Sequence, residues 1–262
     1  MIERSPSAVV FLHLFKCGGT TVIERLRRTV PAERFVHVRD PKAFRATLAA
    51  DPARAGAFDV VAGHIDIRLM ERHFPSARWV TVLRDPVDRM LSQYEHFRRA
   101  AGRADETGTD AHHFRVAFCA ANDLAAFVTS EDPRLTVYTR NFMSRKLAGG
   151  DGDAGDEAAL GERALASLGR FALVGTTDTL DRDFLPALDA LTAAGRRWAL
   201  PRRRANASAS RGGRRPALDR RTLAAILEYN RVDAALYAAA RWFDPRHRAP
   251  AATADRPTEI AR

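Results

Sequence analysis

Cysteine and long hydrophobic runs are both scarce in this sequence. The two cysteines, Cys17 and Cys119, are too few for a disulfide framework or a cysteine-based metal cluster. The longest apolar run near the start of the chain, residues 8–12, is far too short for a membrane-spanning helix or for the core of a signal peptide. We therefore expect a cytoplasmic protein without an integral membrane segment.

Lysine is scarce as well. Only Lys16, Lys42 and Lys146 occur, against 39 arginines, so the position of each lysine is unusually informative. The chain has 262 residues, of which 46% are hydrophobic, and this is enough to bury a substantial core. We expect a single domain over residues 1–243 and a disordered tail over residues 244–262.

Positive charge is concentrated in one late segment. Ten arginines and a single acid, Asp219, lie within residues 196–221, and they account for nearly all of the net charge of +10. The centre of the segment lacks hydrophobic periodicity, which predicts a mobile loop. It is interpreted as a lid over an anionic ligand, as a surface for a polyanion, or as a solvated basic loop. Because that centre has no aromatic residues for base stacking, nucleic acid is disfavoured as a partner.

Short apolar runs alternate with helical patterns along the chain. Such alternation predicts an α/β fold, with a central and mostly parallel sheet that is flanked by helices. In folds of this kind, ligands bind at the carboxyl ends of the strands. The predicted strands cover residues 9–14, 34–38, 59–62, 79–83 and 171–174.

Residues 9–29 have the pattern of an anion-binding loop. A predicted strand leads into Gly18 and Gly19, and a helix with a regular apolar stripe follows. Backbone N–H groups at the start of that helix, together with Lys16, favour a phosphate-like anion. The usual Walker pattern is absent, because Lys16 precedes the glycines. An ordinary glycine turn between strand and helix is the alternative interpretation.

A second candidate segment begins where the fourth predicted strand ends. Asp85 is a good N-cap and Pro86 a good first helical residue, so the start of a helix is predicted sharply. Arg84 and Ser92 are expected to be free to face a ligand, and the Arg84 guanidinium can bind a phosphate through two N–H groups. The alternative is an ion pair of Arg84 with Asp85 or Asp88. The buried stripe of this helix is expected to be Val87, Met90, Leu91 and Tyr94, with Asp85, Asp88, Arg89, Ser92 and His96 on the opposite side.

These two segments resemble motifs of one enzyme family. HLFKCGGTT, residues 13–21, resembles the HIPKTGGTS loop that binds the 5′ phosphosulfate of the donor in carbohydrate sulfotransferases related to heparan sulfate 2-O-sulfotransferase. LRDPVDRMLSQY, residues 83–94, is similar to the 3′-phosphate motif of that family, L-R-D-P-x-x-R-x-x-S-x-Y. Weaker similarities occur at residues 141–149, 171–181 and 230–240, so the resemblance covers most of residues 9–243.

The resemblance implies a P-loop-NTPase-like sulfotransferase fold and an O-sulfotransferase activity. The donor would be 3′-phosphoadenosine 5′-phosphosulfate (PAPS), no metal would take part, and the acceptor would be a hydroxyl of a glycan, lipid or small molecule. Phe15 stands where the family has proline, and Cys17 where it has threonine. By match of position, the donor's 5′ phosphosulfate is expected at Lys16, Cys17, Gly18, Gly19, Thr20 and Thr21. Its 3′ phosphate is expected at Arg84 and Ser92, and a late loop would close over the donor with Arg204, Asn206 and Arg211.

Lys16 and His64 are the predicted catalytic residues. Sulfuryl transfer requires stabilisation of the departing oxygen, which Lys16 can supply, and a base for the proton of the acceptor hydroxyl. His64 lies at the carboxyl end of a predicted strand, and imidazole titrates near neutral pH. In the resembling family, a Gly-His pair at this point supplies the catalytic histidine. Asp66 is a candidate to orient His64, and a histidine with a purely structural hydrogen bond is the alternative.

Two other functions stay open. An unusual nucleotide kinase would place Mg²⁺-binding carboxylates near the loop, but no strand in the sequence is a convincing carrier for them. A non-catalytic polyanion-binding module would tolerate the loss of Lys16 and His64. The sequence does not identify the acceptor.

Overall fold

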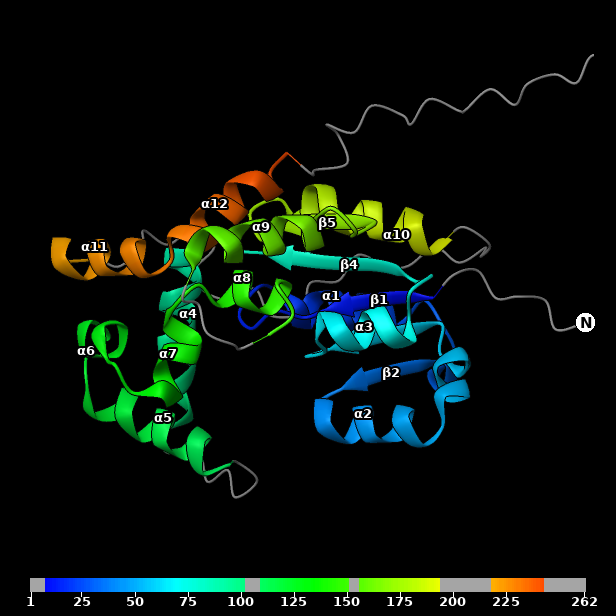
Figure 1. Cartoon of the computed structure of the whole chain (residues 1–262), viewed down its shortest axis with the longest axis horizontal. Helices are drawn as coiled ribbons and strands as arrows, with labels where there is room; N and C mark the ends of the chain where they lie inside the picture. Colours follow the sequence, from blue (N-terminus) through cyan, green and yellow to red (C-terminus); the bar gives the residue numbers. More distant parts are fainter. Residues whose placement is uncertain (1–7, 102–108, 151–155, 194–217, 243–262) are drawn as a thin grey trace, which may run out of the picture.

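A parallel sheet of five strands, in the order β2-β3-β1-β4-β5, forms the centre of this computed structural model (Figure 1). The structure describes residues 8–101, 109–150, 156–193 and 218–242, so the predicted tail lies outside it. The strands are β1 (Val9–Leu12), β2 (Phe35–Val38), β3 (Val60–Gly63), β4 (Arg78–Leu83) and β5 (Leu173–Thr176). The predicted α/β fold is confirmed, and the predicted strand ends differ from the observed ones by at most two residues.

Helices cover both faces of the sheet, and others lie beyond the carboxyl ends of its strands. The α-helices are α1 (Gly19–Arg27), α2 (Pro41–Ala50), α3 (Ile67–His73), α4 (Pro86–Ala100), α5 (Asp110–Ala121), α6 (Leu124–Thr129), α7 (Pro133–Thr139), α8 (Phe142–Leu147), α9 (Glu157–Leu168), α10 (Leu185–Ala193), α11 (Arg220–Tyr229) and α12 (Arg231–Ala240). Two 3-10 helices, η1 (Ala32–Arg34) and η2 (Pro52–Ala57), and a π-helix, η3 (Leu180–Phe184), are shorter. No helix of the described residues is long and apolar enough to cross a membrane. Figure 1 shows α5, α6, α7 and α11 gathered beyond the carboxyl ends of the strands.

The side chains of β1 explain why the sheet is covered on both faces. Val10 and Leu12 pack into a core that includes buried residues of α2, α3, α8, α9 and α12. Val9 and Phe11 point to the other face and pack with buried residues of α1 and α10. Every residue of β1 is therefore buried, and its sequence is continuously apolar, as is usual for a strand in a parallel sheet.

A third core forms beyond the sheet and includes buried residues of α4, α5, α6, α7 and α11. The expected orientation of α4 was wrong for Arg89, which has no exposed surface, and Leu91 of the expected buried stripe is only half-buried. The Arg89 guanidinium lies 4.9 Å from the centre of the Phe142 ring and donates a hydrogen bond to the carbonyl of Tyr138. The expectation placed Arg89 on a solvated face because it assumed that only one side of α4 is buried. In the fold α4 also packs against α12, and this second contact side was not visible in the pattern.

Candidate functional site

Three predicted site residues meet at the carboxyl edge of the sheet. Strand β1 lies between β3 and β4, so the segments that leave these three strands are neighbours. The Nη1 atom of Arg84 donates a hydrogen bond to the carbonyl of Lys16 over 3.0 Å. The Nδ1 atom of His64 lies 2.9 Å from the carbonyl of His13. Residues 13–18, which we call the anion loop, are thus bonded to the segments on both sides.

The anion loop ends on an open helix N-terminus. Gly18 is the N-cap of α1, with a φ of 77° in the left-handed region, and no side chain caps the helix. Lys16 also has a positive φ, 66°. Thr20 is exposed and Thr21 half-buried in the first helical turn. A helix start without a side-chain cap, next to a lysine, suits an anionic ligand.

Gly19, the first residue of α1, is needed for a different reason. A Cβ atom on Gly19 would lie 1.9 Å from Cδ2 of His13, far inside the closest contact that two carbon atoms allow. The His13 ring therefore packs directly over the backbone of Gly19. It also stacks on the His64 ring, with 4.4 Å between the ring centres. The glycine allows the two histidines and the helix start to occupy one small volume.

Lys16 of the anion loop lies close to Arg84, so two positive charges are brought together. The pKa of Lys16 is lowered, first by burial and then by Arg84 and Arg99. Among the described residues, neither Lys16 nor Arg84 forms an ion pair with an acid. The predicted alternative, an ion pair of Arg84 with Asp85 or Asp88, is therefore not found among the described residues. The carboxylate of Asp85 instead caps α4, accepting hydrogen bonds from the backbone of Val87 and Asp88 over 3.0 and 3.1 Å. A bound anion would relieve the repulsion between the two cations.

Cys17 turns its side chain away from the loop surface. It is 1% exposed, and its Sγ lies 3.8 Å from Sδ of Met143. Burial raises the pKa of the thiol to about 12, so the thiol is protonated at neutral pH. Its backbone N–H donates to the carbonyl of Leu14 over 3.2 Å. The thiol and the N–H of Cys17 are therefore both engaged inside the protein.

His64 has the protonation state that a general base requires. A carbonyl can only accept a hydrogen bond, so the contact with His13 places the proton of a neutral His64 ring on Nδ1. The lone pair on Nε2 is then available to accept a proton. The pKa of His64 is lowered, chiefly by burial, although the hydrogen bond to His13 acts in the opposite direction. The neutral ring therefore predominates at neutral pH.

An aromatic cluster that the sequence did not reveal surrounds this ring. Phe15 stacks on His64 with 3.9 Å between the ring centres and 17° between the planes. The ring centres of Tyr138 in α7 and Phe142 in α8 lie 5.8 and 5.9 Å from the ring centre of Phe15. The weak similarity over residues 141–149 was the one signal that pointed to α8. The cluster shields one face of the imidazole and contributes to its burial.

Other predicted residues lie elsewhere. Asp66 does not orient His64, since its carboxylate accepts from the backbone N–H of Leu69 over 2.8 Å and pairs with Arg45. Ser92 is half-buried on α4, two turns beyond Arg84. The predicted lid residues lie outside the part of the chain that the structure describes; they are Arg204, Asn206 and Arg211.

Comparison with known proteins adds no relative to this picture. No protein-family model matches the chain, and no curated protein matches it. What is established is the α/β architecture, with five parallel strands in the order 2-3-1-4-5. Any functional conclusion therefore depends on the residues at the carboxyl edge.

Proposed function

We propose that this chain is a PAPS-dependent O-sulfotransferase that moves a sulfuryl group to a hydroxyl of a glycan, lipid or small molecule. The observation that carries the proposal is the convergence of Lys16, Arg84 and a neutral His64 on the segments that follow three adjacent strands. Two cations that form no ion pair within the described residues suit a donor with anionic groups at both ends. A base beside them suits an acceptor that must lose a proton.

The anion loop fits the phosphosulfate end of such a donor. Left-handed backbone at Gly18 and the uncapped start of α1 present backbone N–H groups rather than side chains. Lys16 would stabilise negative charge on the phosphate oxygen that leaves the sulfur. Arg84 holds the loop through the Lys16 carbonyl with one N–H, and its remaining N–H groups would bind the 3′ phosphate together with Ser92.

His64 would complete the reaction on the acceptor side. Its Nε2 accepts the hydroxyl proton while the acceptor oxygen forms a bond to sulfur. The bond between sulfur and the phosphate oxygen of the donor breaks, and 3′-phosphoadenosine 5′-phosphate (PAP) leaves. The hydrogen bond from Nδ1 to His13 stabilises the resulting imidazolium and keeps the ring in position.

Donor binding gives the first test. Calorimetric titration with PAP should show saturable binding, with ATP and RNA binding more weakly. The lysine content of the chain provides a matched pair of variants, because Lys42 is exposed on α2 whereas Lys16 lies in the anion loop. Lys16→Ala should weaken PAP binding about tenfold or more, since a charge-assisted contact is lost. Lys42→Ala should leave PAP binding unchanged.

A second variant separates binding from chemistry. His64→Asn should retain PAP binding but lose the transfer of radiolabelled sulfate from PAPS to a panel of hydroxyl-bearing acceptors. Tighter binding of ATP than of PAP would contradict the proposal and favour a kinase. Equal effects of the Lys16 and Lys42 variants would contradict the assignment of the loop.

A further inference from the structure

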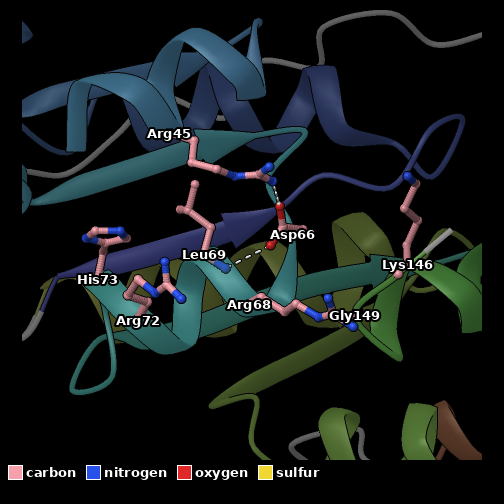
Figure 2. Close-up of a pocket in the computed structure, with 9 residues that line it drawn as sticks. Arg45, Asp66, Arg68, Leu69, Arg72, His73, Lys146 and Gly149 are labelled. Atoms are coloured by element: carbon pink, nitrogen blue, oxygen red, sulfur yellow. Dashed lines mark hydrogen bonds and ion pairs between the residues drawn. The ribbon is translucent and has the colours of Figure 1, made fainter. Parts of the chain in front are cut away.

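A positively charged pocket lies beside the candidate site and has no part in the functions assigned so far. It is formed by α2, α3, the end of α8 and the residues just after it, and its volume is about 370 Å³. Figure 2 shows Arg72 and His73 toward one end of the pocket, Lys146 toward the other, and Asp66 between them. The charged and titratable residues that line it are Arg45, Asp66, Arg68, Arg72, His73 and Lys146.

The charge of the pocket is strongly unbalanced. Four of its side chains are cationic, and Asp66 is the single carboxylate among the residues that line it. Both oxygens of Asp66 are already engaged, one by the backbone N–H of Leu69 and the other by Arg45. The acid therefore neutralises one arginine and does not oppose a ligand at the other cations.

Arg68 and Arg72 are the cations that are left for a ligand. Both are exposed on α3, and neither forms an ion pair within the described residues. The nearest acid on the same helix, Glu71, pairs with Arg170 instead. The Arg68 side chain lies next to Gly149, since a Cβ atom on that glycine would be 3.7 Å from Cγ of Arg68, an ordinary contact. Arg68 thus lies beside Gly149 and has no ion-pair partner in the part of the chain that the structure describes.

The pocket is connected to His64 from two directions. Asp66 is two residues beyond His64, on the segment that leads from β3 into α3. Lys146 acts on His64 electrostatically and contributes to lowering its pKa, after the larger effects of burial and of His37. A ligand that is held at Arg68 or Arg72 and reaches the Lys146 end of the pocket (Figure 2) would therefore approach the residue that acts on His64.

We propose that this pocket binds a phosphate monoester group of the acceptor and so presents a nearby hydroxyl to His64. The inference depends on the proposed sulfotransferase activity, and it adds the substrate class. A doubly charged phosphate monoester matches several cations better than a singly charged carboxylate does, and arginine can bind it through two parallel N–H groups. The volume suits a group of the size of a sugar phosphate.

Calorimetric titration of the full chain with glucose 6-phosphate, glucose and glucuronate tests the proposal. Glucose 6-phosphate should bind, glucuronate more weakly, and glucose not measurably. The double variant Arg68→Gln/Arg72→Gln should weaken binding of glucose 6-phosphate about tenfold or more. The matched control is Arg163→Gln, an exposed arginine on α9 that should leave the affinity unchanged. Equal binding of glucose and glucose 6-phosphate, or an equal effect of the control, would overturn the proposal.

The same variants separate this inference from the proposed function. The double variant should retain PAP binding within about twofold, because Arg68 and Arg72 lie outside the anion loop. If PAP binds and glucose 6-phosphate does not, the phosphate pocket is refuted while the donor site stands. If PAP fails to bind but glucose 6-phosphate binding depends on the two arginines, the pocket stands and the sulfotransferase proposal fails. Binding of phosphatidic acid vesicles that the double variant abolishes would place the phosphate on a lipid in the same pocket.

Discussion

Replacement of Gly19 by alanine should destabilise the protein, although alanine is the better helix former. In the interior of a helix, Gly to Ala is favourable by about 1 kcal/mol. Here the new Cβ would lie 1.9 Å from Cδ2 and 2.0 Å from Nε2 of His13. The His13 ring cannot move away easily, because the rings of Phe11 and His64 stack on it, with ring centres 5.8 and 4.4 Å from its own. Overpacking of this kind typically costs about 1–3 kcal/mol.

The two effects oppose each other, and the steric one is larger. We expect Gly19→Ala to lower the free energy of unfolding by up to about 2 kcal/mol after the helix propensity is subtracted. Gly161→Ala is the matched control, because Gly161 lies inside α9 and its Cβ would be 3.6 Å from Cγ1 of Val232, an ordinary contact. That variant should raise the free energy of unfolding by about 0.5–1 kcal/mol.

Urea unfolding followed by circular dichroism measures both changes as shifts of the midpoint at an unchanged m-value. A double variant adds a sharper check. Once His13→Ala has removed the ring, Gly19→Ala should become neutral or stabilising, since the two residues are coupled through one contact. A Gly19→Ala protein as stable as the Gly161→Ala protein would refute this reading of the loop.

Three further predictions concern buried polar groups. Burial, and after it His64, His37 and Lys16, lowers the pKa of His13 from 6.5 to about 3. Below pH 6.5 the unfolded chain therefore binds more protons than the folded protein does, so the free energy of unfolding should fall as the pH drops below 6.5. His13→Gln should flatten this decline in urea titrations between pH 7 and about pH 5. The Cys17 thiol, with its pKa raised to about 12, should react with iodoacetamide only when urea unfolds the protein, and rapid labelling of the native state would contradict its burial. Asp233→Asn should lower the free energy of unfolding by about 1–3 kcal/mol, because both oxygens of the buried carboxylate accept hydrogen bonds from Met143 or Ser144 and an amide has one acceptor oxygen. Asn at the exposed cap Asp40 should change it little.

The sequence was sufficient for the sheet because local signals determine its strands. Buried parallel strands are short apolar runs, and the N-cap Asp85 followed by Pro86 defines where the next helix starts. Parallel connections then bring the carboxyl ends of the strands to one edge. This is why Lys16, His64 and Arg84 could be expected close together before any contact was known.

Contacts between distant helices could not be predicted in the same way. Arg89 is buried because α4 packs on two sides, and an apolar stripe reports only one of them. The hydrogen-bond partner of His64 also differed from the expected one. The backbone carbonyl of His13 orients the ring. Because every residue has a carbonyl, the residue types in a sequence do not show which one will accept such a hydrogen bond. Asp66, which has the right residue type, is used elsewhere.

The two departures from the sulfotransferase loop motif are explained together by α8. Phe15 packs against Phe142 of this helix, and Cys17 contacts the neighbouring Met143. A proline at position 15 could not stack on His64 as the phenyl ring does, and a threonine at position 17 would bury a hydroxyl beside a thioether. Both substitutions therefore suit a loop that is held against α8. Since Lys146 of the same helix lines the cationic pocket, α8 physically connects the anion loop, the surroundings of His64 and the proposed phosphate site.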